Sequence, residues 1–141
     1  MSKFLISPFF IFGLFIIIFF GHALGLDLRW YDFIDSLDTI HHALGGVWIA
    51  AVVSFLASQY PVFDFKKSHF GAVIFIVGAV AIAGIAWEIF EFFIDKYLIV
   101  PGISAFPKME LVDTVADLAS DLFGGLFFAV IYIQRSVQNR D

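Results

Sequence analysis

Four long apolar segments decide what this chain can fold into. They run over residues 4–25, 39–60, 70–94 and 113–134, and each has the roughly 20 residues that an α-helix needs to cross the hydrocarbon core of a bilayer. Hydrophobic residues make up 61% of the chain, which is more apolar surface than a soluble domain of this size could bury. The sequence therefore predicts an all-α polytopic membrane protein. It would be a single domain over residues 1–141, with four transmembrane helices in an up-down bundle.

Composition excludes several other classes of protein. The chain has no cysteine, so it has neither disulfide bonds nor a thiolate site for zinc. Eight lysines and arginines stand against thirteen acidic residues, whereas nucleic-acid binding needs basic side chains to contact phosphate. We therefore expect no nucleic-acid partner. Any metal ion must be held by oxygen and imidazole ligands.

The basic residues predict how the chain is oriented in the membrane. The first apolar segment is interpreted as an uncleaved anchor, because it is longer than a signal-peptide core and no small-residue cleavage site follows it. Five of the eight lysines and arginines lie on the side of the two termini: Lys3, Lys66, Lys67, Arg135 and Arg140. The positive-inside rule then places both termini in the cytoplasm of what we expect to be a bacterial-type inner membrane.

The connections between the segments differ in character. Residues 27–38 are acidic and aromatic, which is typical of an interfacial turn or a short surface helix. Residues 61–69 carry Lys66 and Lys67. In the third connection Pro101, Gly102 and Pro107 predict turns rather than continuous helix.

Carboxylates interrupt the apolar segments at one end of the predicted bundle. Glu88 and Glu91 lie three residues apart, and Asp113, Asp117 and Asp121 follow one another at intervals of four. Each set therefore lies on one helical face. The third segment ends at the same face of the membrane at which the fourth begins. A rise of 1.5 Å per residue therefore places the two sets of carboxylates at similar depths. An ionisable group in hydrocarbon costs about 2.5 to 3.5 kcal/mol on insertion scales, so such a cluster needs a compensating partner.

Histidines lie at the same end of the bundle. His41 and His42 follow Asp38 by three and four residues at the start of the second segment, so they share its helical face. His22 closes the first segment nearby, where it could also lie among lipid headgroups. Asp38 and Asp113 have an alternative role as helix caps, because an acidic side chain at a helix start complements the helix dipole.

We predict that this polar end binds a divalent metal ion. Carboxylates about 6 Å apart repel each other by nearly 3 kcal/mol at an effective dielectric of about 20, so protons, cations or a metal must offset their charge. Carboxylate and imidazole ligands suit Mg²⁺, Mn²⁺, Fe²⁺ or Zn²⁺. Glu88 and Asp117 are also the candidate catalytic residues. The predicted metal ligands are His41, His42, Glu88, Glu91, Asp113, Asp117 and Asp121.

The ordered set of motifs in the last three segments resembles a known family. Asp38-x-x-His41-His42-x-x-Gly45-Gly46 is followed by Trp87-Glu88-x-x-Glu91 and by Asp113-x-x-x-Asp117-x-x-x-Asp121-x-x-Gly124. This order is similar to that of the small VanZ-like integral membrane proteins, in particular their YjdF-type branch in the bacterial inner membrane. The resemblance implies a compact helical membrane protein, some of whose relatives are linked to glycopeptide-antibiotic tolerance and envelope processes.

Three classes of function fit these features. A metal-dependent hydrolase or transferase would use the ion to polarise a phosphoryl or similar group of a lipid-linked or envelope substrate, or to activate water. A transport element would relay protons or cations, although the cytoplasmic halves of the last two segments contain almost no polar residue. An accessory subunit would pack its polar end against a larger complex, with His41 or His42 ligating haem or chlorophyll. We favour the metal-dependent enzyme, with membrane lipid as a partner and a homo-oligomer or larger complex as an open alternative.

Overall fold

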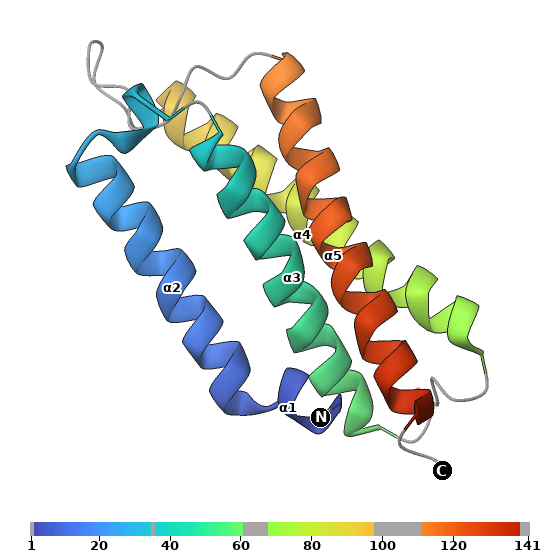
Figure 1. Cartoon of the computed structure of the whole chain (residues 1–141). Coiled ribbons are helices and arrows are strands. Elements are labelled where there is room, and N and C mark those ends of the chain that lie inside the picture. The colour runs from blue at the N-terminus through green and yellow to red at the C-terminus, as the bar shows by residue number, and fades with distance from the viewer. Residues whose placement is uncertain (1, 35, 61–67, 98–110, 139–141) are drawn as a thin grey trace.

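The computed structural model is a bundle of long helices, and it describes residues 2–34, 36–60, 68–97 and 111–138. The helices run alternately up and down (Figure 1). They are α2 (Pro8–Asp27), α3 (Leu37–Ser58), α4 (His69–Tyr97) and α5 (Leu111–Gln138). All four are long and apolar enough to cross a membrane, and the described residues contain no strand. The predicted all-α bundle of four transmembrane helices is therefore confirmed.

The helix bounds shift slightly from those predicted. The helices start at residues 8, 37, 69 and 111 and end at residues 27, 58, 97 and 138. The largest shift at a helix start has a local cause, because the Ser7 side chain accepts a hydrogen bond of 3.2 Å from the Phe10 backbone N–H. Pro8 then occupies the first turn, where its missing N–H costs nothing. The residues before this cap form a separate short helix, α1 (Ser2–Leu5).

Glycines let α3 and α5 pack with their backbones in contact. A Cβ atom on Gly46 would collide with the backbone of Asp121, and one on Gly124 would collide with the backbone of Ala43. Small residues at an interface are the usual means by which transmembrane helices approach closely. Below this contact α3, α4 and α5 share an apolar core formed by Ala50, Ala51, Ala72, Ile76, Val80, Phe128, Ala129, Tyr132 and Ile133.

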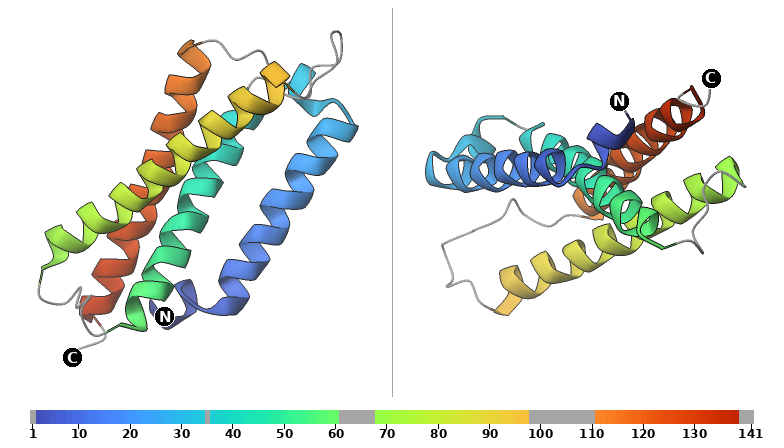
Figure 2. Two further views of the ribbon diagram at one scale, coloured as in Figure 1. Left: turned by 180° about the vertical axis from the view of Figure 1, so that it is seen from behind. Right: turned by 90° about the horizontal axis from the view of Figure 1, so that it is seen from below.

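Helix α2 is the outlying member of the bundle. Gly25 is its only buried residue. Both α2 and α4 pack on α3, and they lie apart from one another when the bundle is seen from below (Figure 2). Trp48 of α3 fastens α2 near its start, because the indole Nε1–H donates to the Ile11 carbonyl at 3.0 Å. The Phe15 ring lies against the same indole at 5.6 Å between centroids. Most of the remaining surface of α2 is apolar and exposed.

The connection from α2 to α3 contains a short 3-10 helix, η1 (Trp30–Asp32). It follows Arg29, which adopts a left-handed conformation with φ of 57° and so turns the chain sharply after α2. This agrees with the short surface helix expected within residues 27–38. The predicted loops that carry Lys66 and Lys67, and Pro101, Gly102 and Pro107, lie outside the described residues, as does Arg140.

Candidate metal centre and membrane pocket

His42 of α3 is the centre of a buried polar cluster. Its Nε2 atom lies 3.9 Å from each of three carboxylate oxygens, which belong to Asp38, Glu88 and Asp117. These carboxylates come from α3, α4 and α5 respectively, so each core helix contributes one. The side chain of His42 is 5% exposed. A separation of 3.9 Å is too long for a hydrogen bond. The three carboxylates therefore face the imidazole nitrogen without bonding directly to it.

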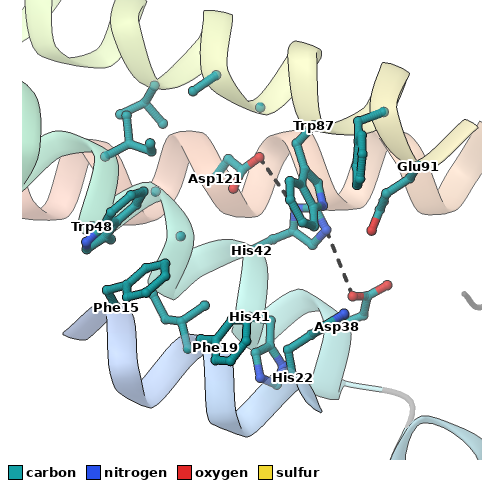
Figure 3. Close-up of a pocket in the computed structure, with 18 residues that line it drawn as sticks. Phe15, Phe19, His22, Asp38, His41, His42, Trp48, Trp87, Glu91 and Asp121 are labelled. Atoms are coloured by element: carbon teal, nitrogen blue, oxygen red, sulfur yellow. Dashed lines mark hydrogen bonds and ion pairs between the residues drawn. The ribbon is translucent and has the colours of Figure 1, made fainter. Parts of the chain in front are cut away.

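Asp121 of α5 holds the other side of the His42 ring. Its Oδ2 atom lies 3.4 Å from His42 Nδ1, and Figure 3 shows the ring between Asp121 and Asp38. Gly84 of α4 makes room for this carboxylate, since a Cβ atom there would lie 2.5 Å from Asp121 Oδ2. A carboxylate that accepts from Nδ1 fixes the imidazole tautomer and leaves the Nε2 lone pair for a metal.

Two groups of side chains have ligand atoms close enough to share an ion. Asp38, His42 and Asp117 form one group, and His42, Glu88 and Glu91 form the other; within each, the ligand atoms lie within 4.8 Å of one another. His42 is common to both groups, so a single imidazole serves either. Glu88 Oε1 is buried and accepts no hydrogen bond from any described residue. A buried carboxylate oxygen without a partner is costly, and a bound cation would satisfy it.

The structure places the predicted metal ligands in three different ways. His42, Glu88, Glu91 and Asp117 belong to the two groups, and Asp121 contacts the far side of His42. Asp38, for which capping was the alternative, also has its carboxylate in the cluster. Asp113 is half-buried in the first turn of α5 and lies outside both groups.

His41 also lies outside both groups. Neighbouring residues on an α-helix point about 100° apart, so His41 and His42 cannot face the same centre. His41 instead belongs to a second polar group on the other side of α3. Its Nδ1 atom lies 2.9 Å from the Leu37 carbonyl and 3.3 Å from the Tyr31 hydroxyl. That hydroxyl lies 2.7 Å from His22 Nδ1, so α2, η1 and α3 are joined by one chain of hydrogen bonds.

Tyr31 is a polar residue of this second group that the sequence pattern did not single out. Burial, followed by the charges of Asp38 and Glu91, raises the pKa of Tyr31 above its ordinary value, so the phenol keeps its proton and remains a donor. Its ring fits against α2 because Gly25 has no side chain; a Cβ atom there would lie 2.8 Å from the ring. Gly21, one turn earlier, makes room for the His41 imidazole in the same way, at 3.0 Å. The spacing of these two glycines was the available sequence signal.

A pocket of about 450 Å³ connects the two polar groups. It lies between α2 and α4, with α3 as its floor, and polar residues gather toward one end (Figure 3). The polar lining residues are His22, Asp38, His41, His42, Glu91 and Asp121. The larger apolar part is lined by Phe15, Ile18, Phe19, Trp48, Ile49, Val80, Ala83, Trp87 and Phe90. The arrangement is that of a ligand pocket, since such pockets are mostly apolar with a few convergent polar groups.

Comparison with known proteins gives the family. The model of a family described as "Predicted membrane protein (DUF2238)" matches residues 1–137. The chain belongs to this family. The match covers all four helices and every residue of the cluster around His42, so the cluster is part of the DUF2238 domain and not an addition to it. No curated protein and no solved structure matches the chain. Together with the four apolar helices, membership of DUF2238 establishes an integral membrane protein.

Proposed function

We propose that this DUF2238 protein binds a divalent metal ion at His42 and uses it on a lipid-linked or cell-envelope substrate. The observation that carries the proposal is the position of His42 Nε2, 3.9 Å from carboxylate oxygens of three helices. An ion with metal–ligand bonds of about 2.1 Å spans ligand atoms up to about 4.2 Å apart, so these separations fit. One of these oxygens, Glu88 Oε1, is also buried and has no hydrogen-bond partner among the described residues, and a bound cation would satisfy it.

The ligand types favour some metals over others. One imidazole with several carboxylates suits Mn²⁺, Fe²⁺ or Zn²⁺ better than Mg²⁺, which prefers oxygen ligands and retained water. Asp121 strengthens the case for a transition metal, because a carboxylate behind a histidine ligand orients the ring and raises its basicity. The ion would supply Lewis-acid activation of a substrate oxygen or of water. Glu88 and Asp117 are the proposed catalytic residues, because a carboxylate of the cluster that is not bound to the ion is placed to accept a proton.

Metal analysis of the protein purified in detergent tests this proposal directly. We expect close to one divalent ion per chain. Glu88→Gln and Asp117→Asn each keep the size of the side chain but remove a negative charge beside the ion, so each should weaken metal binding at least about tenfold. Asp113→Asn is the matched control, because Asp113 lies outside both groups and its substitution should leave metal content unchanged. The proposal is wrong if the wild-type protein holds no stoichiometric metal and the Glu88→Gln and Asp117→Asn variants are as stable as the wild type.

We also propose that this chain is a VanZ-like, YjdF-type protein and that it lies in a bacterial inner membrane. With both termini in the cytoplasm, the start of α3 and the end of α4 lie near the extracytoplasmic face, and so does the cluster around His42. A substrate from the cell envelope would then meet the ion from outside. The orientation rests on the distribution of lysine and arginine.

This orientation can be tested because the chain contains no cysteine. Phe33, which is 80% exposed next to η1, and Tyr60, which is 59% exposed beyond α3, mark the two ends of the bundle. In spheroplasts, a membrane-impermeant maleimide should label Phe33→Cys and should label Tyr60→Cys only after lysis. The reverse pattern would place the cluster on the cytoplasmic side.

The apolar core supports a site within the membrane over a path across it. From the cluster toward the other face, the buried side chains shared by α3, α4 and α5 are apolar, with Ile76 and Val80 among the most deeply buried. Ser54 is the one buried polar side chain described in that region, and its hydroxyl has no described hydrogen-bond partner. Proton or cation relay needs a run of polar groups. The core therefore favours chemistry at one end of the bundle.

A further inference from the structure

We infer that the pocket between α2 and α4 takes one apolar chain of a membrane amphiphile whose polar end is an uncharged hydroxyl held by His41. The inference rests on the proposed function and deepens it, because it names the substrate class of the same site. Three observations carry it: the form of the apolar lining, the sign of the charges at the polar end, and the free acceptor atom of His41.

The apolar part of the pocket has the form of a chain-binding site. Its volume of about 450 Å³ falls in the range of small-molecule pockets, roughly 300 to 1,000 Å³, and is at the lower end of it. One hydrocarbon chain fits such a space better than the two chains of a phospholipid. The two helices that flank it expose apolar side chains on their outer faces, as Ile17 of α2 and Ile82 of α4 show. An amphiphile already in the bilayer can therefore reach the pocket sideways.

The polar end of the pocket disfavours an anionic headgroup. Three carboxylates, from Asp38, Glu91 and Asp121, line it, and none of its described lining residues is a lysine or arginine. Glu88 and Asp117 lie directly behind. A divalent ion adds two positive charges against these five carboxylates, so a phosphate or carboxylate would still meet net negative charge. The same net charge would attract an ammonium group, but an ammonium has no lone pair to offer the neighbouring ion. A hydroxyl carries no charge and keeps its oxygen lone pairs.

His41 offers that headgroup a hydrogen-bond acceptor. The Leu37 carbonyl can only accept, so the His41 Nδ1 atom 2.9 Å away must carry the proton. The neutral ring then has its lone pair on Nε2. That atom lies against Gly21, and no described residue donates to it, while His41 lines the pocket (Figure 3). A hydroxyl can donate to Nε2 and keep its own oxygen lone pairs for the neighbouring metal site.

Tryptophan fluorescence in lipid nanodiscs tests the inference, because Trp48 and Trp87 both line the pocket. The probe is a dibrominated long-chain alcohol, whose bromine atoms quench nearby indoles. We expect saturable quenching in the wild type and its loss in Ala83→Leu, which fills the apolar part of the pocket. Ala86→Leu is the matched control, since Ala86 lies one turn away on the exposed face of α4 and does not line the pocket; it should bind like the wild type.

The headgroup is tested with the same assay. His41→Phe keeps a ring but removes the acceptor, so the alcohol should bind roughly three- to tenfold more weakly, the usual effect of one hydrogen bond. The control His69→Phe, at the opposite end of the bundle, should bind normally. A dibrominated alkyl phosphate and a dibrominated alkyl amine of equal length should each bind at least about tenfold more weakly than the alcohol. Binding of either that equals or exceeds binding of the alcohol would overturn the assignment of the headgroup.

Metal content measured on the same samples separates this inference from the proposed function. Ala83→Leu and His41→Phe leave both ligand groups intact and should keep their ion. The pocket inference alone is refuted if the protein holds metal but does not bind the alcohol saturably. It is also refuted if the protein holds metal and Ala83→Leu binds the alcohol as well as the wild type does. Saturable binding of the alcohol by a protein that holds no metal refutes the proposed function and leaves the pocket. Quenching that never saturates reports only contact with bulk lipid and counts against the inference.

Discussion

Replacing His42 with alanine should abolish stoichiometric metal binding and lower the affinity by at least about 100-fold. His42 is the one nitrogen ligand in both candidate groups, and the three carboxylate oxygens nearest to Nε2 come from three different helices. Without the imidazole these oxygens have no common neighbour, and their mutual repulsion opposes their coming together on an ion. Competition with a chromophoric chelator, on protein in detergent, measures the loss.

Two neighbouring changes make this result specific. His41→Ala alters the adjacent residue of the same helix but leaves both groups complete, so it should retain the wild-type affinity. Asp121→Asn removes the charge behind the ring and keeps an amide oxygen that can accept from Nδ1. It should therefore lower the metal affinity by an intermediate factor of about 10 to 100. Wild-type metal binding by His42→Ala, or equal losses in His41→Ala and His42→Ala, would show that the ion is not held at this centre.

The second large effect is expected at Gly46, where an added methyl group has no space. A Cβ atom there would collide with backbone atoms of Asp121, which cannot move aside as a flexible side chain would. Gly46→Ala must therefore push α3 and α5 apart, at a cost of about 1 to 3 kcal/mol in the free energy of unfolding. Because Asp117 and Asp121 move with α5, metal affinity should fall as well. Unfolding in mixed micelles, followed by circular dichroism, gives the free energy.

The adjacent glycine supplies the control. A Cβ atom on Gly45 would lie 3.8 Å from its nearest neighbour, an oxygen of Asp121, which is ordinary van der Waals contact. Gly45→Ala should therefore be close to neutral, and Gly78→Ala, where nothing lies within 4 Å, should be neutral or slightly stabilising. If Gly46→Ala and Gly45→Ala have the same free energy of unfolding, α3 and α5 are not in backbone contact as described.

Helical periodicity made much of the cluster predictable. A rise of 1.5 Å and 3.6 residues per turn fix which residues share a face and a depth, and on that basis the spacing of Glu88, Asp117 and Asp121 predicted that their helical faces converge. The glycines beside these residues were a further sequence signal, because Gly46 and Gly124 mark the points where α3 and α5 come into backbone contact. The number of helices and their alternating direction followed from the lengths of the apolar segments.

Other features depend on packing that periodicity does not contain. Which of His41 and His42 faces the cluster is decided by the rotation of α3 about its axis, and the close contact at Gly46 sets that rotation. Asp38 lies in the first turn of α3, where a cap and a ligand look alike in sequence. Tyr31 reaches His22 and His41 from a connection whose path follows the left-handed Arg29. The pocket itself follows from how far α2 stands from α4, which no local pattern encodes.

The way α2 is attached to α3 separates the proposed metal centre from one wall of the pocket. Among the described residues, α2 contributes nothing to either ligand group. It is tied to α3 by Trp48 near one end and by the hydrogen bonds of Tyr31 near the other. A different tilt of α2 would change the width and depth of the pocket while leaving the distances around His42 as they are. Exchanging the aromatic residues of this peripheral helix would therefore reshape the pocket without disturbing the proposed metal centre.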